Sequence, residues 1–151
     1  MAYELRPVSG PAELRAMHDI RRRALFTPER VPGVVYDENR PEDADPRHQR
    51  FVLWLDGVAI GVARLDRKDA GEGVVRLVAI TPAEQRRGHG RQLMGLVDGE
   101  ARQRGMKRLM LNAHPEAVEF YRRLGWQAEV WDPSELAHAM TDGIVQMVKA
   151  I

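Results

Sequence analysis

The chain has 151 residues, a formal net charge of +1 at pH 7 and no cysteine. Without cysteine it can form neither a disulfide framework nor a thiolate zinc site, and it cannot carry an acyl group on a cysteine. The near-neutral charge argues against a nucleic-acid partner. No apolar run approaches the roughly 20 residues that cross a bilayer, which argues against a membrane protein. Because the N-terminus also lacks the apolar core of a signal peptide, we expect one domain over residues 1–151 in the cytoplasm.

The first third of the chain predicts one strand, one helix and a long loop. Residues 3–8 alternate weakly between apolar and polar side chains, which indicates a strand. Pro11 suits the first turn of a helix, and apolar residues then recur at helical spacing from Leu14 to Phe26. Residues 27–47 contain four prolines and an acidic run. A loop of this length in a compact domain is usually functional or mobile.

A hairpin and a central strand are predicted next. Residues 49–55 and 58–65 are largely apolar and flank Asp56-Gly57, a strong signal for a two-residue hairpin turn. After a looser turn, Val74 to Ile80 are nearly all aliphatic, as in a strand that is covered on both faces.

The last third of the chain predicts alternating helices and strands. In order they are a helix over 91–104, a strand over 109–112, a short helix over 116–124, a strand over 126–131, a helical turn over 134–140 and a strand over 143–149.

A glycine-rich corner, Gln85-Arg86-Arg87-Gly88-His89-Gly90, joins the central strand to the next helix. Its two glycines allow a tight turn and leave amide hydrogens unshielded. These amides lie at a helix N-terminus, where the helix dipole favours an anion, and Arg86, Arg87 and Arg91 add positive charge. The corner therefore predicts a pyrophosphate site; the alternative is that it only turns the chain.

This corner resembles the acetyl-CoA-binding motif of the GNAT family, the GCN5-related N-acetyltransferases, which reads Q/R-x-x-G-x-G/A after a strand. A second GNAT-like motif follows at Phe120-Tyr121-x-x-Leu124-Gly125-Trp126. The resemblance implies an α/β fold: a mixed, mostly antiparallel twisted sheet of about seven strands, splayed at its centre, with helices on both faces. It also implies an enzyme that uses acetyl-CoA and no metal, and that passes the acetyl group to a primary amine by direct attack.

The resemblance also implies which residues bind the cofactor. The backbone of the central strand would bind the pantetheine arm and polarise the thioester carbonyl, with a strand bulge exposing an amide. Asn112 either binds the same arm or makes a turn at the end of its strand. The expected cofactor-binding residues are Val78, Ala79, Ile80, Gln85, Arg86, Arg87, Gly88, His89, Gly90, Arg91 and Asn112.

Tyr121 matches the GNAT tyrosine that protonates the leaving thiolate. A phenol with a pKa near 10 keeps its proton at neutral pH and can supply it; the alternative is a packed aromatic ring. The general base is open, and its candidates are His114, His138, Asp37, Glu38 and Asp43. Some relatives carry a histidine at the start of the last strand, where this chain has Ile144, so that mechanism does not transfer.

Arg76 and Glu38 are the candidate substrate-binding residues. With strict alternation, Arg76 shares a face of the central strand with Val78 and Ile80. A buried arginine needs a partner, so it either binds a substrate carboxylate or pairs with an acid such as Asp43 or Glu38. The acidic loop favours a cationic acceptor and Arg76 favours a carboxylate. The predicted acceptor is therefore a small amine, an amino acid-like molecule or a peptide terminus.

The sequence is also compatible with other functions and with assembly into a dimer. The chain could be a CoA-binding sensor or interaction domain with little turnover. A nucleotide-binding protein is disfavoured, because Gly90 is followed by Arg91-Gln92 and not by the lysine and hydroxyl residue of a P-loop. A homodimer is suggested by relatives and by the apolar last strand, which would pair across subunits as an exposed edge.

Overall fold

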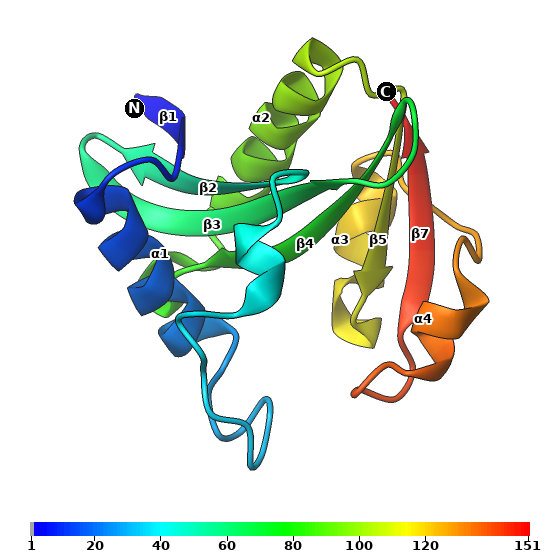
Figure 1. Cartoon of the computed structure of the whole chain (residues 1–151), viewed down its shortest axis with the longest axis horizontal. Helices are drawn as coiled ribbons and strands as arrows, with labels where there is room; N and C mark the ends of the chain where they lie inside the picture. Colours follow the sequence, from blue (N-terminus) through cyan, green and yellow to red (C-terminus); the bar gives the residue numbers. More distant parts are fainter. Residues whose placement is uncertain (1) are drawn as a thin grey trace.

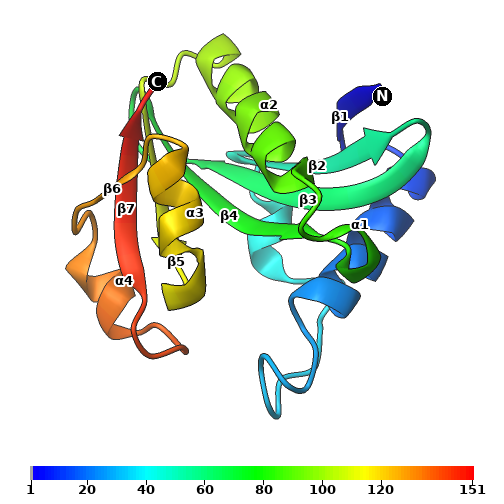
Figure 2. The same cartoon turned by 180° about the vertical axis from the view of Figure 1, so that it is seen from behind.

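A computed structural model describes residues 2–151, which form one seven-stranded sheet with helices on both faces (Figures 1 and 2). The strands are β1 (Tyr3–Pro7), β2 (His48–Leu55), β3 (Val58–Arg67), β4 (Glu72–Ile80), β5 (Arg108–Ala113), β6 (Gln127–Ala128) and β7 (Val145–Ala150). The helices are α1 (Pro11–Ala24), α2 (His89–Gln103), α3 (Val118–Arg123) and α4 (Pro133–Ala137). Short 3-10 turns lie at Pro41–Ala44, Pro82–Glu84 and Pro115–Ala117.

The strand order is β1-β2-β3-β4-β5-β7-β6, and only the β4–β5 pair is parallel. The predicted fold class is therefore confirmed. The β2–β3 hairpin turns at Asp56 and Gly57 as predicted, with positive φ values of 48° and 83°. Such a pair of left-handed residues matches the twist of the flanking strands.

The two largest apolar clusters lie on opposite faces of the sheet. Helices α2 and α3 cover one face, where Leu93 and Val97 pack against Phe51 and Leu53 of β2. Helix α1 covers the other face, where Met17 packs in a second cluster with Val52 of β2 and Val62 of β3. Strand β2 supplies both clusters because successive side chains of a strand point to opposite faces.

The C-terminal part departs from two predictions. Strand β6 holds only Gln127 and Ala128, because the amides of Trp131 and Asp132 bond to the side-chain oxygen of Gln146, each at 2.9 Å, and leave the backbone ladder. The prediction that the last strand is an exposed edge is also wrong, since β7 lies between β5 and β6. A homodimer therefore cannot be argued from an open edge at this strand.

Strand β4 contains the irregularity that opens the sheet. It pairs with β5 only through Glu72, Gly73 and Val74, and beyond them the two strands part (Figure 1). On its other edge, Ala79 pairs with Val62 and Arg76 pairs with Arg64, so two residues of β4 oppose one residue of β3. This is the predicted bulge, and its residue Leu77 has a φ of +52°.

The bulge changes which side chains share a face. Val78 and Ile80 pack into the core under α2, whereas Ala79 packs into the core under α1. Arg76 bonds to Asp66 and Glu135 on the α1 and α4 side, so the prediction that it shares a face with Val78 and Ile80 is wrong. The extra residue of the bulge breaks the two-residue period on which that prediction rested.

No helix within residues 2–151 combines the length and the apolar character that a membrane span requires.

Candidate functional site

A cleft of about 940 Å³ lies where β4 and β5 part. Leu77 and Val78 of the bulge line it from β4, and Tyr121 of α3 lines it as well. Asp66 and Glu135 line its other end, on the side of α1 and α4. The cleft therefore reaches from one face of the sheet to the other through the gap between the strands.

The edge of β4 that faces this gap offers backbone groups to a ligand. Pairing with β5 stops at Val74, so residues 75–80 have no ladder partner on that side. Unpaired strand edges bind extended ligands through main-chain hydrogen bonds. Val78, Ala79 and Ile80, the residues expected to bind a pantetheine arm, all lie on this segment.

The glycine corner at the end of β4 has the backbone geometry of an anion site. Arg86 and Gly88 have positive φ values of 64° and 86°, and Gly88 is the N-cap of the 15-residue helix α2, with no side chain capping it. At Gly90 a Cβ would lie 3.2 Å from Cζ of Phe120, so this glycine allows α2 to approach α3 closely. Arg87 and Arg91 are exposed beside the corner, as is Arg86.

Two side chains of this corner bond to neighbouring elements and brace it. The buried His89 ring has Nδ1 2.7 Å from the hydroxyl of Tyr3 and Nε2 3.4 Å from a carboxylate oxygen of Glu84. Gln85 donates from Nε2 to the carbonyl of Ile80 at 2.9 Å. These bonds hold the corner against β1 and β4, and they leave the main-chain amides of His89 and Gln85 free of side-chain partners among residues 2–151.

Tyr121 lies on α3, with its ring at T-shaped angles to Phe120 and Trp126 at centroid distances of 5.1 and 6.0 Å. Its hydroxyl has no hydrogen-bond partner among residues 2–151. Burial raises the pKa of Tyr121 to about 12. The phenol is therefore protonated at neutral pH, and its residue lines the cleft.

A smaller hollow of about 460 Å³ adjoins the cleft and is lined by Asn112, His114 and His138. The side-chain amide of Asn112 bonds at both ends: Nδ2 donates to Glu135 at 2.7 Å, and Oδ1 accepts from Gln146 at 3.0 Å. His138 is exposed, with Nδ1 2.7 Å from the carbonyl of Ser134. His114 lines both hollows, and its ring has no hydrogen-bond partner within the described part of the chain.

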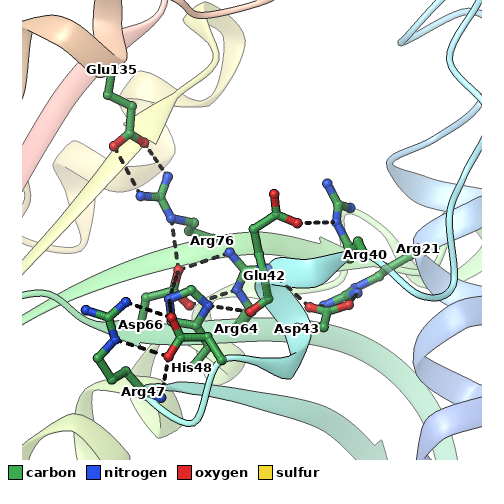
Figure 3. A network of polar contacts seen from close by, with 11 residues as sticks. Arg21, Arg40, Glu42, Asp43, Arg47, His48, Arg64, Asp66, Arg76 and Glu135 are labelled. Atoms are coloured by element: carbon green, nitrogen blue, oxygen red, sulfur yellow. Dashed lines mark hydrogen bonds and ion pairs between the residues drawn. The ribbon is translucent and has the colours of Figure 1, made fainter.

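Six side chains form a ladder of alternating charges across the α1 side of the sheet (Figure 3). In spatial order this charge ladder is Arg21, Asp43, Arg64, Asp66, Arg76 and Glu135. The shortest N–O distances in the first four steps are 2.6, 3.1, 2.8 and 3.1 Å, and Glu135 accepts hydrogen bonds from both terminal nitrogens of Arg76. The first four residues are buried, and the last two lie in the cleft.

Two carboxylates of the charge ladder, Asp43 and Glu135, have pKa values that their neighbours lower. Burial alone would raise the pKa of Asp43, but hydrogen bonds and charge from Arg21 and Arg64 outweigh it and lower the pKa. Burial would also raise the pKa of Glu135, but the charge of Arg76 and the hydrogen bonds from Arg76 and Asn112 outweigh this effect and lower the pKa. Within residues 2–151, no group of three or more histidine or acidic side chains is arranged to hold a metal ion.

The sequence of this chain matches the profile of the Acetyltransferase (GNAT) family over residues 14–126. The chain belongs to the GNAT acetyltransferase family. An uncharacterised, ycf52-like N-acetyltransferase of Prochlorococcus marinus is 34% identical to it over 70 residues, which are 46% of this chain and 39% of that relative. The match therefore spans well under half of the relative's length.

Two solved structures show the same fold as this GNAT chain at low sequence identity. The ribosomal-protein-S18-alanine N-acetyltransferase of Escherichia coli has a TM-score of 0.74 and 22% identity, with 99% of this chain and 94% of that chain covered. The PaiA N-acetyltransferase of Thermoplasma acidophilum, solved with coenzyme A, has a TM-score of 0.71 and 16% identity, with both chains fully covered.

The GNAT fold brings some of the predicted site residues together and separates others. Tyr121, His114, Asn112 and Arg76 all line the cleft, from α3, from the two parted strands and from the turn after β5. Glu38 does not line it: its exposed carboxylate pairs with Arg22 of α1.

The prediction from sequence missed Asp66 and Glu135, the two carboxylates that hold Arg76. No local motif marks either residue, and Glu135 lies 59 positions from Arg76 along the chain.

Proposed function

We propose that this GNAT protein transfers an acetyl group from acetyl-CoA to a primary amine by direct attack within a ternary complex. The observation that carries the proposal is the parting of β4 from β5 at the Leu77 bulge, which leaves a strand edge open beside Tyr121. This arrangement gives a thioester a place to lie, with hydrogen-bond donors on one side and a proton donor nearby. Further support comes from the PaiA N-acetyltransferase of the same fold, whose structure contains coenzyme A.

The cofactor would lie along a continuous stretch of backbone. Its pyrophosphate would bind the amides from Arg86 to Arg91, and the exposed arginines there would add charge attraction. Its pantetheine arm would run along residues 78–80 of β4, and the thioester carbonyl would accept a hydrogen bond from an amide at the bulge. Asn112 would position the far wall of this channel through its bonds to Glu135 and Gln146.

The reaction needs a neutral amine and a proton for the leaving group. The amine nitrogen attacks the thioester carbon and forms the carbon–nitrogen bond, the carbon–sulfur bond breaks, and the thiolate takes the proton of the Tyr121 hydroxyl. The proton that the nitrogen loses as the amide forms restores the tyrosine through solvent. An amine with a pKa of about 10 is mostly protonated at pH 7, so a base must first remove a proton. His114 is the best placed of the candidate bases because it lines the cleft and its ring nitrogens are uncommitted.

Calorimetric titration with acetyl-CoA, free CoA and ATP tests the cofactor site. We expect binding of acetyl-CoA and CoA and no binding of ATP. Arg87→Glu should weaken CoA binding by at least tenfold, because the exposed Arg87 beside the corner would then repel the pyrophosphate. Arg102→Glu, the same charge reversal at the exposed far end of α2, is the matched control and should change the affinity little.

Release of free thiol with a panel of primary amines then tests transfer itself. Failure of CoA to bind would overturn the proposal. Binding of CoA without thiol release from any amine would favour the alternative, a CoA-binding sensor or interaction domain.

A further inference from the structure

Arg76 is already arranged as a receptor for a carboxylate. Its Nε donates to Asp66 at 3.1 Å, and its two terminal nitrogens donate to the two carboxylate oxygens of Glu135. A guanidinium that gives two parallel hydrogen bonds to one carboxylate is the usual geometry for specific carboxylate recognition. In this chain, the carboxylate in that position is the protein's own.

The two acids that hold Arg76 differ in how easily they can be replaced. Asp66 belongs to β3, is 5% exposed, and also bonds to Arg64 through both of its oxygens, so it is part of the sheet. Glu135 lies on the five-residue helix α4, and its side chain is 27% exposed. Figure 3 shows Glu135 reaching from α4 to Arg76 on the sheet below it. A ligand carboxylate would therefore displace Glu135 and leave Asp66 in place.

The charge balance of this end of the cleft favours an anion. Without Glu135, the charge ladder holds three arginines and two aspartates, so its fixed part carries one excess positive charge. Five further charged side chains line the cleft and form no ion pair within residues 2–151, the cations Arg30, Arg67 and Lys68 and the acids Asp69 and Glu116, and together they add one more excess positive charge.

The acidic loop does not offset these positive charges. Four of its carboxylates are paired with an arginine of the same chain: Glu38 with Arg22, Glu42 with Arg40, Asp43 with Arg21 and Asp45 with Arg47. Asp37 forms no ion pair within residues 2–151, but it does not line the cleft, and it accepts a hydrogen bond from the amide of Asn39 at 2.8 Å. The acidic loop therefore gives little support to the prediction of a cationic acceptor.

Arg76 also has the right position along β4. It immediately precedes Leu77, the bulge residue beside which the thioester is proposed to lie. A carboxylate bound at Arg76 would hold an amine a few bonds away close to the thioester carbon. Such tethering lowers the entropic cost of bringing the two reactants together.

From these observations we infer that the acceptor is an amine with a carboxylate close to it, and that Arg76 binds this carboxylate in exchange for Glu135. The statement that the bound amine is an acetyl acceptor rests on the proposed function, whereas binding of its carboxylate to Arg76 does not depend on turnover. The shared chemistry fits a free α-amino acid or a peptide with an acidic residue next to its N-terminus. Glu135 then acts as an internal competitor that covers Arg76 until the acceptor binds.

The first test compares each carboxylate with its neutral analogue. A panel of L-amino acids, their carboxamides, and dipeptides with and without an acidic second residue is titrated calorimetrically into the protein–CoA complex and assayed for thiol release with acetyl-CoA. We expect the acids to bind at least tenfold more tightly than the carboxamides. Preference within the dipeptide arm would identify a peptide as the source of the carboxylate, and preference within the amino acid arm would identify a free amino acid.

Two substitutions test the exchange, because they should change the binding of acids in opposite directions. Arg76→Gln should abolish the preference for acids and leave CoA affinity unchanged. Glu135→Gln keeps the size of the side chain but removes the competing charge, so it should lower the KM of acids several-fold. A purely structural role for Glu135 would give no such improvement. Arg6→Gln and Glu4→Gln, in an exposed ion pair on β1, are the matched controls.

Each outcome bears on one conclusion. Carboxamides that bind as well as acids, or weaker acid binding by Glu135→Gln, would overturn the inference. Arg76-dependent binding of acids without any acetyl transfer would overturn the proposed function and leave the carboxylate site standing. Thermal unfolding of each variant checks its fold, and Glu135→Gln together with the acid–carboxamide comparison decides the matter if Arg76→Gln does not fold.

Discussion

The two sides of the cleft are built from different kinds of groups. On the α2 side, the candidate cofactor site is a continuous stretch of backbone from Val78 to Arg91, and two glycines shape it. On the α1 side, the site is a ladder of charged side chains that come from α1, β3, β4, α4 and the loop before β2. The backbone side is suited to a cofactor that is common to a family, whereas the side-chain side can change with the acceptor.

The sharpest test at the junction of the two sides is Tyr121→Phe. Removal of a general acid costs about 10²–10⁴-fold in rate, so we expect turnover to fall by that factor while CoA affinity stays the same. The ring and its contacts with Phe120 and Trp126 are retained. Steady-state thiol release and calorimetry measure the two quantities.

A matched control for this change is Tyr3→Phe, which removes the hydroxyl that bonds to His89 behind the glycine corner. It should act on CoA affinity and leave the chemical step intact. Wild-type turnover in Tyr121→Phe would show that the hydroxyl is not the acid.

Loss of Asp43 should have the largest effect on stability. Asp43→Asn leaves the buried guanidinium groups of Arg21 and Arg64 without their shared carboxylate. Breaking a buried pair in this way costs about 3–5 kcal/mol of unfolding free energy. Urea denaturation measures it, and the neighbouring exposed Glu42→Gln should change it by less than about 0.5 kcal/mol. Equal effects of the two changes would show that the charge ladder does not stabilise the α1 side.

Two glycines on the α2 side should respond in opposite directions to alanine. Gly88→Ala places a side chain at a φ of +86° and should destabilise the protein by about 1–2 kcal/mol and weaken CoA binding. Gly95→Ala lies inside α2, with open space around a new Cβ, and should stabilise the protein by about 0.5–1 kcal/mol. Thermal unfolding distinguishes the two, and a loss of stability at both positions would contradict the backbone argument.

Acid should weaken the α1 side in a graded way. The pKa of Asp43 is lowered in the folded state from its ordinary value of 3.8, because its two arginines outweigh the effect of burial. Its contribution is therefore fully present above the unfolded pKa and is lost as pH falls through the folded pKa. The unfolding free energy should decline below about pH 4, and the decline should be shallower in Asp43→Asn. A parallel decline in both proteins would assign the acid sensitivity to other carboxylates.

Features that depend on a few neighbouring residues were predicted from the sequence. Asp56 and Gly57 specified the hairpin, since few residues adopt two successive left-handed conformations. The glycine corner specified the turn into α2 in the same way, and aliphatic patterning specified the central strand. These signals act through local backbone preferences, so they can be recognised in the sequence without knowledge of the tertiary structure. They were enough to indicate the family and the candidate cofactor site.

The partners of Arg76 were decided only by the tertiary structure. The sequence offered Asp43 and Glu38 as its acids, but the bulge at Leu77 turns Arg76 toward Asp66, and α4 brings Glu135 to it across 59 positions. Ion pairs form between charges that the fold brings within about 4 Å, irrespective of their distance along the chain. One extra residue in β4 reverses the face of every side chain beyond it. The proposed acceptor side is therefore determined by the fold, whereas the candidate cofactor side is determined by one stretch of the sequence.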